Sequence, residues 1–492
     1  MKVQNSYSLH CAIASIAMLL LLSCGSNQEF EDTEEIVRGK KVTTDSISAN
    51  KFLAISDVHF DPYYDPTLFD SLVASDPSEW KRIFEGSAIT TLSTYHADAN
   101  YPLLRSSLEK MKAVSAKPDF IVIAGDLLAH DFQSKCLSNP GQDEASVQLF
   151  IAKTLTFLKL MIEETYPGVP VFSALGNNDA YCGDYMVQPN SPFLQMVANL
   201  WKPMLHSSDT ASFDATFKEG GYYSVASPTD TNLRIIVLNT IFMSNQYNLG
   251  KHGVFCANVV PQENHEPGKK LLTWLEGELA AVRAKGKRVW IVQHIPPGVD
   301  TYGSLKSLSG AGCIGNPVFD MDTSFNRRYI DILRNHADLI AANFAGHYHR
   351  DDFRLIPDST GKTMQSSMLY FPSISPVNSN NPGFKVVDYN PKNGQLLDYT
   401  VYYANVANSP EGNLSAWSSE YRFSDVYREK EITTASLTKI YRNLDTNQAM
   451  QMDYLQYYPV SKGSSPFSQF RAYWCIVGNV TAEGVRECSC GS

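Results

Sequence analysis

Residues 52–59, with the sequence Phe-Leu-Ala-Ile-Ser-Asp-Val-His, constrain the fold of this chain more than any other stretch. A short apolar run that is bounded by polar residues is typical of a buried strand. Side chains two positions apart on a strand point to the same side of the sheet. Asp57 and His59, at the end of this run, could therefore bind one metal ion through a carboxylate oxygen and an imidazole nitrogen.

Four more apolar runs end in side chains that can bind a metal ion. They are residues 121–125 before Asp126, residues 171–176 before Asn177, Asn178 and Asp179, residues 289–293 before His294, and residues 340–346 before His347 and His349. In open α/β sheets, binding sites form beyond the carboxyl ends of the strands. Five strands that each end in a candidate ligand therefore predict one shared metal site.

Helical patterns alternate with the strands, at residues 102–115, 146–164, 268–283 and 326–336. This alternation predicts an α/β fold in which parallel strands carry helices on their faces. Residues 353–403 show strands and turns without helical periodicity, which indicates a mixed or second sheet. The aromatic-rich sequence beyond residue 405 predicts a helical C-terminal region whose aromatic side chains belong to the core.

The N-terminal sequence predicts export. Residues 12–22 form an apolar stretch of signal-peptide length that is short for a membrane span. Leu21-Leu22-Ser23-Cys24 resembles a bacterial lipobox, so Cys24 is a candidate lipidation site. We expect a signal peptide of the lipoprotein type over residues 1–23 and a polar tether over residues 24–50. The protein would then be lipid-anchored to a bacterial membrane, or otherwise secreted.

The charge of the chain limits its partners. A formal net charge of −10, without a basic cluster, argues against binding to a nucleic-acid polymer. Nothing in the sequence indicates an obligate protein partner.

Seven cysteines follow Cys24, and an exported chain can oxidise them. Cys136 and Cys182 both follow candidate ligand strands and could bridge neighbouring loops. Cys475 and Cys488, which are close in the sequence, are another candidate pair. The odd number leaves at least one thiol unpaired within the chain.

The candidate ligands are Asp57, His59, Asp126, Asn177, His294, His347 and His349. Carboxylate, amide and imidazole groups without a thiolate suit zinc, iron or manganese, and not a structural zinc site. Seven ligands are too many for one tetrahedral ion but suit two ions that share a carboxylate. Asp126 is the expected bridge, because Gly125 before it lets the backbone approach closely. Two such ions would clamp a phosphoryl group and generate hydroxide at neutral pH.

The motifs D-x-H, G-D, G-N-x-D, H and G-H-x-H, in this order, resemble those of the calcineurin-like metallophosphoesterases. More narrowly, the chain resembles the acid-sphingomyelinase-like phosphodiesterases. Residues 125–131, 199–203, 220–224, 233–240, 346–351 and 381–383 support the narrower resemblance. It implies a two-layer β-sandwich catalytic domain flanked by helices over residues 51–404, and a disulfide-linked helical region over residues 405–492.

The resemblance also implies a cofactor and its ligands: two divalent metal ions, with zinc expected. Asp57, His59, Asp126 and His349 would hold one ion. Asp126, Asn177, His294 and His347 would hold the other. The implied activity is that of an exported phosphodiesterase, which hydrolyses a phosphodiester or phosphoanhydride bond by metal-activated hydroxide.

The chain departs from its relatives at the expected proton donor. The common G-N-H-D motif reads Gly-Asn-Asn-Asp over residues 176–179, and Asn178 cannot exchange protons in the useful pH range. His130, in the G-D-x-x-x-H position, is then the candidate general acid. The alternative is that His130 is a loop histidine with a structural hydrogen bond. Among the other histidines, His96 and His206 are the strongest candidates for contact with substrate.

Other functions stay open. The chain could be an endopolyphosphatase-like hydrolase, or a surface binding protein with weakened catalysis, which Asn178 favours and the intact ligand set disfavours. A phosphomonoesterase of the purple-acid type needs a tyrosine shortly after Asp126, where this chain has Leu127, Leu128 and Ala129. The choice among a sphingomyelin-type phospholipid, a nucleotide and polyphosphate would lie in residues 60–101 and 243–265, which carry no motif.

Overall fold

The structure is a computed structural model that describes residues 49–491 except 208, 211, 231, 310–311, 409–413 and 464. The predicted signal peptide, the lipidation site Cys24 and nearly all of the polar tether lie outside the described residues. Residues 47–492 form one compact unit.

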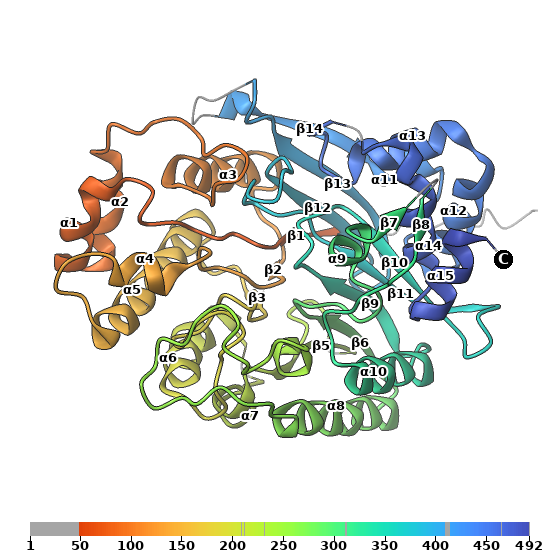
Figure 1. Ribbon diagram of the computed structural model, residues 1–492, viewed down its shortest axis with the longest axis horizontal. Coiled ribbons are helices and arrows are strands. Elements are labelled where there is room, and N and C mark those ends of the chain that lie inside the picture. The colour runs from red at the N-terminus through yellow and green to blue at the C-terminus, as the bar shows by residue number, and fades with distance from the viewer. Residues whose placement is uncertain are drawn as a thin grey trace, which may run out of the picture. The chain divides into compact units, whose positions relative to one another are not determined.

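Two six-stranded mixed sheets form the core of the described chain (Figure 1). The first sheet has the order β14-β13-β12-β1-β2-β3. Its strands are β1 (Asn50–Ile55), β2 (Ile121–Ile123), β3 (Val171–Ser173), β12 (Gly383–Tyr389), β13 (Leu396–Ala404) and β14 (Trp417–Arg422). The strands β1, β2 and β3 run parallel, whereas β12, β13 and β14 continue the sheet in antiparallel pairs.

The second sheet has the order β10-β11-β9-β6-β5-β4. Its strands are β4 (Tyr223–Ala226), β5 (Leu233–Val237), β6 (Arg288–Val292), β9 (Ile340–Ala345), β10 (Phe353–Pro357) and β11 (Met364–Tyr370). The four central strands β5, β6, β9 and β11 are parallel. A short hairpin joins β7 (Leu308–Ser309) and β8 (Cys313–Ile314).

Aromatic side chains join the two sheets face to face. Phe52 of β1 has its ring centroid 5.0 Å from Trp290 of β6 and 5.8 Å from Phe344 of β9. Phe120, just before β2, lies 5.7 Å from Trp290. These rings are almost completely buried, so the two inner faces share one core. The predicted two-layer β-sandwich of an α/β protein is confirmed.

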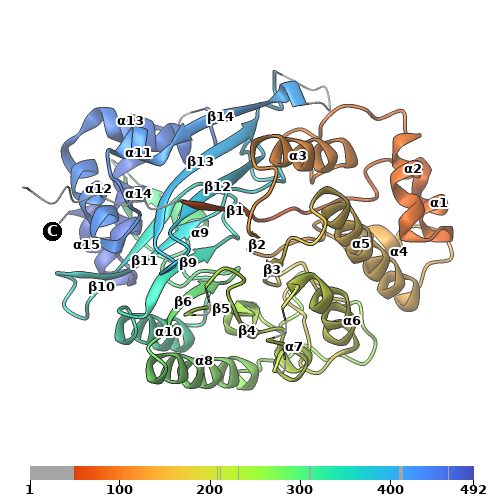
Figure 2. The same cartoon turned by 180° about the vertical axis from the view of Figure 1, so that it is seen from behind.

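Helices flank both sheets (Figures 1 and 2). The α-helices before β4 are α1 (Phe69–Ala74), α2 (Trp80–Glu85), α3 (Tyr101–Val114), α4 (Phe132–Leu137), α5 (Glu144–Thr165), α6 (Pro192–Trp201) and α7 (Phe213–Gly220). Between β5 and β10 lie α8 (Glu266–Ala284), α9 (Thr301–Leu305) and α10 (Thr323–Asn335). The 3-10 helices are η1 (Pro66–Leu68), η2 (Pro77–Glu79), η3 (Lys202–Leu205), η4 (Thr240–Met243), η5 (Leu414–Ala416) and η6 (Phe467–Gln469).

Two of the long helices, α3 and α5, begin at capping side chains. The side chain of Asn100 accepts a hydrogen bond from the amide of Leu103 at the start of α3, and that of Asp143 accepts one from Ser146 in α5. By length and composition α5 alone among the described helices could cross a membrane, but half of its apolar window is buried within the fold. It is therefore a core helix of this unit.

The C-terminal region packs on the β10 and β11 end of the second sheet (Figure 2). It contains α11 (Phe423–Tyr427), α12 (Thr434–Thr446), α13 (Gln448–Tyr457), α14 (Phe470–Gly478) and α15 (Ala482–Cys490). The sequence predicted helices from about residue 405, but Trp417–Arg422 forms β14. The reason is that the edge strand β13 offers free backbone groups, with which β14 pairs from Ala404 to Thr400.

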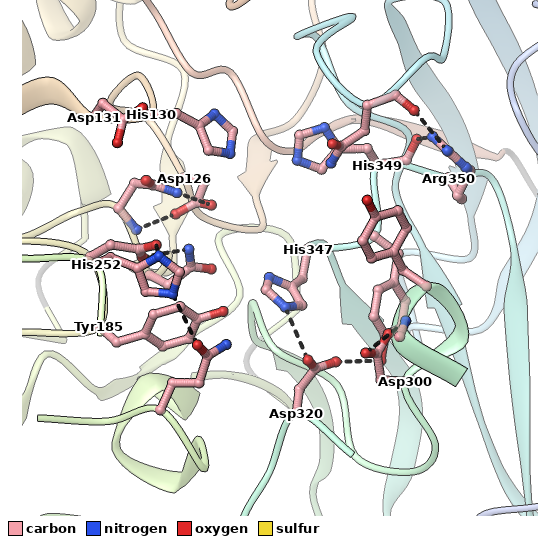
Figure 3. A pocket seen from close by; sticks show the side chains of 18 of the residues that line it. Asp126, His130, Asp131, Tyr185, His252, Asp300, Asp320, His347, His349 and Arg350 are labelled. Carbon is pink, nitrogen blue, oxygen red and sulfur yellow. Dashed lines mark hydrogen bonds and ion pairs between the residues drawn. The ribbon is translucent and has the colours of Figure 1, made fainter. Parts of the chain in front are cut away.

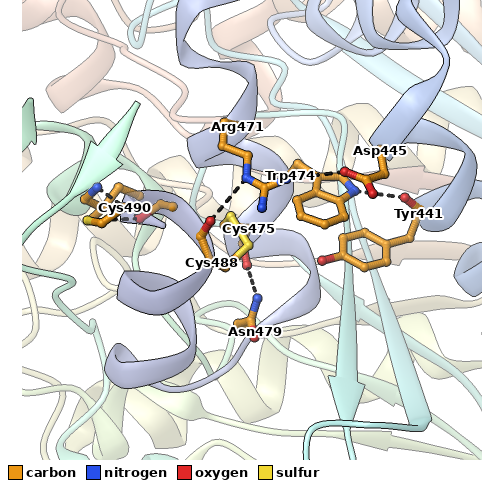
Figure 4. Close-up of a disulfide and its surroundings, with 10 residues drawn as sticks. Tyr441, Asp445, Arg471, Trp474, Cys475, Asn479, Cys488 and Cys490 are labelled. Carbon is orange, nitrogen blue, oxygen red and sulfur yellow. Dashed lines mark hydrogen bonds and ion pairs between the residues drawn. A yellow bond between two sulfur atoms is a disulfide. The ribbon is translucent and has the colours of Figure 1, made fainter. Parts of the chain in front are cut away.

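Three disulfides lie within the described residues. Cys475 and Cys488 join α14 to α15, as expected (Figure 4). Cys313 pairs with Cys490 and fastens β8 to the end of α15. The guanidinium of Arg471 lies over the Trp474 ring beside the first of these bonds. Disulfides persist in oxidising compartments, so they indicate an exported protein.

The suggested bridge between Cys136 and Cys182 is wrong. Cys182 pairs with Cys256, which fastens the loop after β3 to the loop after η4, and Cys136 is a buried free thiol. Cys136 lies in α4, where its side chain faces the core beneath Tyr63. No local pattern indicates this pairing, because Cys256 is 74 residues away from Cys182.

Candidate metal centre and active site

The predicted ligands meet at the carboxyl ends of β1, β2, β3, β6 and β9. Five of them, Asp57, His59, Asp126, His347 and His349, have positive φ angles between 41° and 74°. Such backbone conformations are costly for residues other than glycine and gather at functional sites. Gly176 shows how close the segments are, because a Cβ atom there would lie 2.0 Å from Asp126 Oδ1. Glycine is therefore required at this position.

Asp126 lies between two groups of side chains, of which Figure 3 labels His349 in one and His347 in the other. Its Oδ2 atom is 3.5 Å from His59 Nε2 on one side and 3.2 Å from His294 Nε2 on the other. The backbone amide of Asn178 donates to Oδ1 at 2.8 Å, and its side-chain amide donates to Oδ2 at 3.0 Å. Asn178 thereby fixes the carboxylate in the position that a bridging ligand needs.

The first group combines Asp57, His59 and His349. His349 Nε2 is 3.3 Å from Asp57 Oδ1 and 3.2 Å from His59 Nε2. The Nδ1–H of His59 donates to the carbonyl of Leu128 at 2.9 Å, which leaves Nε2 with its lone pair. Lone pairs of nitrogen and oxygen thus converge at one point, as a cation requires. This donor set fits a divalent metal ion.

The second group combines His294, Asn177 and His347. His294 Nε2 is 3.1 Å from Asn177 Oδ1 and 3.3 Å from His347 Nδ1. His294 Nδ1–H donates to the carbonyl of Ala124 at 2.6 Å. The side-chain amide of Asn177 donates to Asp184 at 2.8 Å, which turns its oxygen toward His294. The second group therefore also brings ligand atoms to one point and fits a second ion. Burial would lower the pKa of His294, but the charges of Asp126 and Asp57 raise it to about 10, so an ion bound here would displace a proton from Nε2.

Burial and neighbouring charges decide the protonation of this centre. Burial raises the pKa of Asp57, but His349, His294 and His59 outweigh burial and lower it to about 2. Burial, with the charge of His130, lowers the pKa of His59 to about 3. Asp57 is therefore ionised and His59 is neutral at pH 7, which are the forms that bind metals.

Asp179 holds two of the ligand loops together through hydrogen bonds to their backbone. Its carboxylate accepts the amides of Leu127, Leu128 and Gly176 at 2.9–3.1 Å, and so holds the loop after β2 against the loop after β3. Burial and the charge of Asp126 raise the pKa of Asp179 to about 7.

His130 stands beside the first group of ligands. Its ring stacks on His59 with centroids 4.2 Å apart, and its Nδ1–H donates to Asp98 at 2.9 Å. Asp98 also accepts the backbone amide of His130 at 2.8 Å. Burial would lower the pKa of His130, but the hydrogen bond and charge of Asp98 raise it to about 9. The imidazole is thus oriented, protonated at pH 7 and exposed to the cavity.

A cavity of about 550 Å³ lies over the ligands. Among the residues that line it are the predicted metal ligands Asn177, His347 and His349 and the predicted catalytic residues His130 and Asn178. His96 and His206 do not line it, which corrects the expectation that they are the strongest candidates for substrate contact. His252 lines it instead, because the Cys182–Cys256 disulfide holds its loop over Tyr185, 5.7 Å away by ring centroids.

Sequence reasoning also missed several carboxylates and a cation. Asp300 and Asp320 form one wall, where Asp320 accepts the Tyr348 hydroxyl at 2.8 Å and lies 3.7 Å from His347 Nε2. Asp98 and Arg350 were also missed. Arg350 directly follows the G-H-x-H motif, and that adjacency was the one available signal. The other residues lie on loops without a motif.

Comparison with known proteins agrees with this site. The Calcineurin-like phosphoesterase family matches residues 50–351, and the Acid sphingomyelin phosphodiesterase C-terminal region matches residues 363–480. Sphingomyelinase phosphodiesterase C of Dictyostelium discoideum is 29% identical over 89% of this chain and 92% of its own. Cyclic GMP-AMP phosphodiesterase SMPDL3A of Bos taurus is 28% identical over 90% of this chain and 91% of its own. Acid sphingomyelinase-like phosphodiesterase 3b of Homo sapiens is 28% identical over 84% of this chain and 83% of its own.

The chain belongs to the calcineurin-like phosphoesterase family. Within that family it is a metal-dependent phosphoric diester hydrolase of the acid sphingomyelinase-like group, with the C-terminal region that marks the group.

Proposed function

We propose that the protein is an exported phosphodiesterase with a centre for two metal ions, for which zinc is the expected metal. The observation that carries the proposal is the Asp126 carboxylate, whose Oδ2 atom lies within 3.5 Å of an imidazole nitrogen in each of two ligand groups. Asp57, His59, Asp126 and His349 would hold one ion, and Asp126, Asn177, His294 and His347 the other. When bound, two such ions activate water and neutralise charge on the phosphoryl group.

Around this centre, the chain's own side chains orient groups and move a proton. His130 would protonate the leaving oxygen from its exposed Nε2, since Nδ1 is held by Asp98. Asn178, which replaces the usual histidine, would position Asp126 through its two donated hydrogen bonds. This arrangement gives Asn178 a role that needs no proton exchange.

The proposed substrate is a small phosphodiester or phosphoanhydride. The named substrates of the relatives, sphingomyelin and cyclic GMP-AMP, support a soluble or headgroup-sized phosphodiester. An endopolyphosphatase-like activity remains a second candidate. A binding protein with weakened catalysis is disfavoured, because all seven proposed ligands converge.

The test of the function is metal content combined with a substrate panel. We expect two transition-metal ions per chain, and hydrolysis of bis-p-nitrophenyl phosphate, ATP or sphingomyelin by the metal-loaded protein. In Asp126→Asn both the metal content and the activity should fall, because one carboxylate serves both ions. A well-folded wild type with one ion per chain would contradict the two-metal centre.

We further propose that Cys24 carries a lipid anchor. A lipidated protein partitions into detergent and membranes, so Cys24→Ser should move the protein from the membrane fraction to the soluble fraction of expressing bacteria. Cys136→Ser, in which a buried thiol is changed, serves as the control and should stay in the membrane fraction. Membrane partition of Cys24→Ser would refute the anchor.

A further inference from the structure

A second cavity of about 270 Å³ opens beside the active-site cavity. The two cavities share Tyr302, Tyr348 and Arg350 as lining residues. The far side of the second cavity is formed by the C-terminal region, including Tyr458, Lys462 and Tyr473. A substrate bound at the metal centre could therefore extend past Arg350 into this space.

The C-terminal segment that closes the second cavity is fastened to the metal-ligand loop. The amide of Asp351 donates to the carbonyl of Tyr458 at 3.2 Å, and the side-chain amide of Asn381 donates to the carbonyl of Val460 at 2.8 Å. Val460 is buried with a φ angle of 55°, a rare conformation for a β-branched residue. The surrounding contacts therefore hold this segment, and with it Lys462, in one position.

The lining of the second cavity is cationic. Arg350 donates to the carbonyls of His349 at 3.2 Å and Asn378 at 2.8 Å (Figure 3). Its guanidinium lies 5.7 Å from the Tyr458 ring centroid. Lys462 lies 5.1 Å from the Tyr95 ring centroid. No carboxylate is among the described residues that line this cavity, and none of the described carboxylates forms an ion pair with Arg350 or Lys462. Neither positive charge is therefore paired with a carboxylate within this cavity, whereas the carboxylates near Arg350, such as Asp300 and Asp320, line the active-site cavity.

We propose that this second cavity is a subsite for a second anionic group of the substrate, such as a further phosphate or a carboxylate. The inference rests on the proposed phosphodiesterase function. Arg350 is held through carbonyls and an aromatic face, so its remaining donors are oriented for an anion. The tyrosine rings alone would suit a quaternary ammonium group. In a cavity whose lining has two cations and no carboxylate among the described residues, however, such a group would be repelled. The subsite thus favours polyanionic substrates over choline headgroups.

The test compares three substrates on the metal-loaded full chain: ATP, bis-p-nitrophenyl phosphate and p-nitrophenylphosphorylcholine. Losing one charge-assisted hydrogen bond should raise the KM for ATP about tenfold in Arg350→Gln, and about threefold in the more exposed Lys462→Gln. The KM for bis-p-nitrophenyl phosphate, which has a single negative charge, should change far less. Lys462→Arg should restore the wild-type KM for ATP, which a purely structural role would not predict.

Charge reversal gives the sharper comparison. Lys462→Glu should lower kcat/KM for ATP and raise it for p-nitrophenylphosphorylcholine, whereas the control Lys392→Gln, an exposed lysine after β12, should alter neither. Equal losses of kcat/KM on all three substrates would overturn the subsite. A wild type that cleaves bis-p-nitrophenyl phosphate but neither hydrolyses ATP nor is inhibited by ATP would overturn it too. Both outcomes are compatible with the phosphodiesterase function. A metal-loaded wild type that cleaves none of the three would refute that function and the subsite with it.

Discussion

At the scale of single residues, the site depends on pairs in which one side chain fixes another. Asp98 orients His130, Leu128 orients His59 through its carbonyl, and Asn178 orients Asp126. These partners leave one nitrogen or oxygen of each functional group free to face the cavity. Conservative changes to the side chains of Asp98 and Asn178 should therefore alter catalysis without unfolding the protein.

His130→Ala tests the proposed general acid. A poor leaving group needs a proton in the transition state, and a positioned acid contributes about 10²–10⁴-fold. We therefore expect His130→Ala to slow the release of an alcohol far more than the release of nitrophenolate, with unchanged metal content. Asp98→Asn should show the same selectivity with a smaller loss. If both leaving groups slow equally, His130 binds phosphate or shapes the site.

A second residue-scale prediction concerns Asp352, which is buried below the C-terminal helices. Burial raises the pKa of Asp352 to about 7, although its carboxylate accepts hydrogen bonds from the Phe353 amide and the Tyr454 hydroxyl. The folded-state pKa lies above the ordinary aspartate value of 3.8. Protonation of Asp352 therefore stabilises the fold below about pH 4, and this contribution is lost as pH rises through about 7.

Asp352→Asn should accordingly raise the Tm at pH 8 by several degrees, because it keeps an acceptor for both donors and removes the buried charge. A pKa difference of this size corresponds to a few kcal/mol. The gain measured by thermal unfolding should shrink as the pH is lowered from 8 to 4. Asp425→Asn, an exposed aspartate in α11, is the control and should change the Tm little at either pH. A gain that does not depend on pH would refute the buried-charge explanation.

At the scale of elements, the sequence predicted what local patterns encode. Each apolar run that ends in a ligand became a strand, four of them inside a sheet and β3 at an edge. The four predicted helices formed as α3, α5, α8 and α10. The sequence did not predict β14, because its pairing depends on a neighbouring edge strand. Asp98 and His252 were missed for a related reason: their loops reach the site through tertiary contacts and a disulfide, which no local pattern records.

The Cys182–Cys256 disulfide offers a test of how loops shape the cavity. With Cys182→Ser and Cys256→Ser combined, the segment that carries His252 and Phe255 should loosen, so the KM for bis-p-nitrophenyl phosphate should rise severalfold with unchanged metal content. The matched control removes Cys475 and Cys488, whose separation is 13 residues. For a loop of about 15 residues, the cost is about 3 kcal/mol. This control should lower the Tm and leave the KM unchanged; equal KM effects in both double variants would refute the local explanation.

At the scale of the whole described unit, the metal centre joins the two sheets. Asp57, Asp126 and Asn177 follow strands of the first sheet, whereas His294, His347 and His349 follow strands of the second. At this edge, buried carboxylates lie together with five residues that have positive φ angles. Buried charge and backbone strain both cost free energy, and a bound cation would offset that cost by neutralising the carboxylates. Metal binding should therefore stabilise the sandwich as a whole.

Metal removal tests this coupling between the site and the fold. A ligand that binds only the folded state at 100 times its Kd adds about 2.7 kcal/mol. Chelation should therefore lower the Tm by several degrees, and added Zn²⁺ should restore it. The decrease in Tm on chelation should be much smaller in Asp126→Asn, which loses the shared ligand. In His130→Ala it should be as large as in the wild type, because His130 is not a ligand. If chelation strips two ions per chain without changing the Tm, the metals serve chemistry alone, and the sheets are held together by the aromatic core around Phe52 and Trp290.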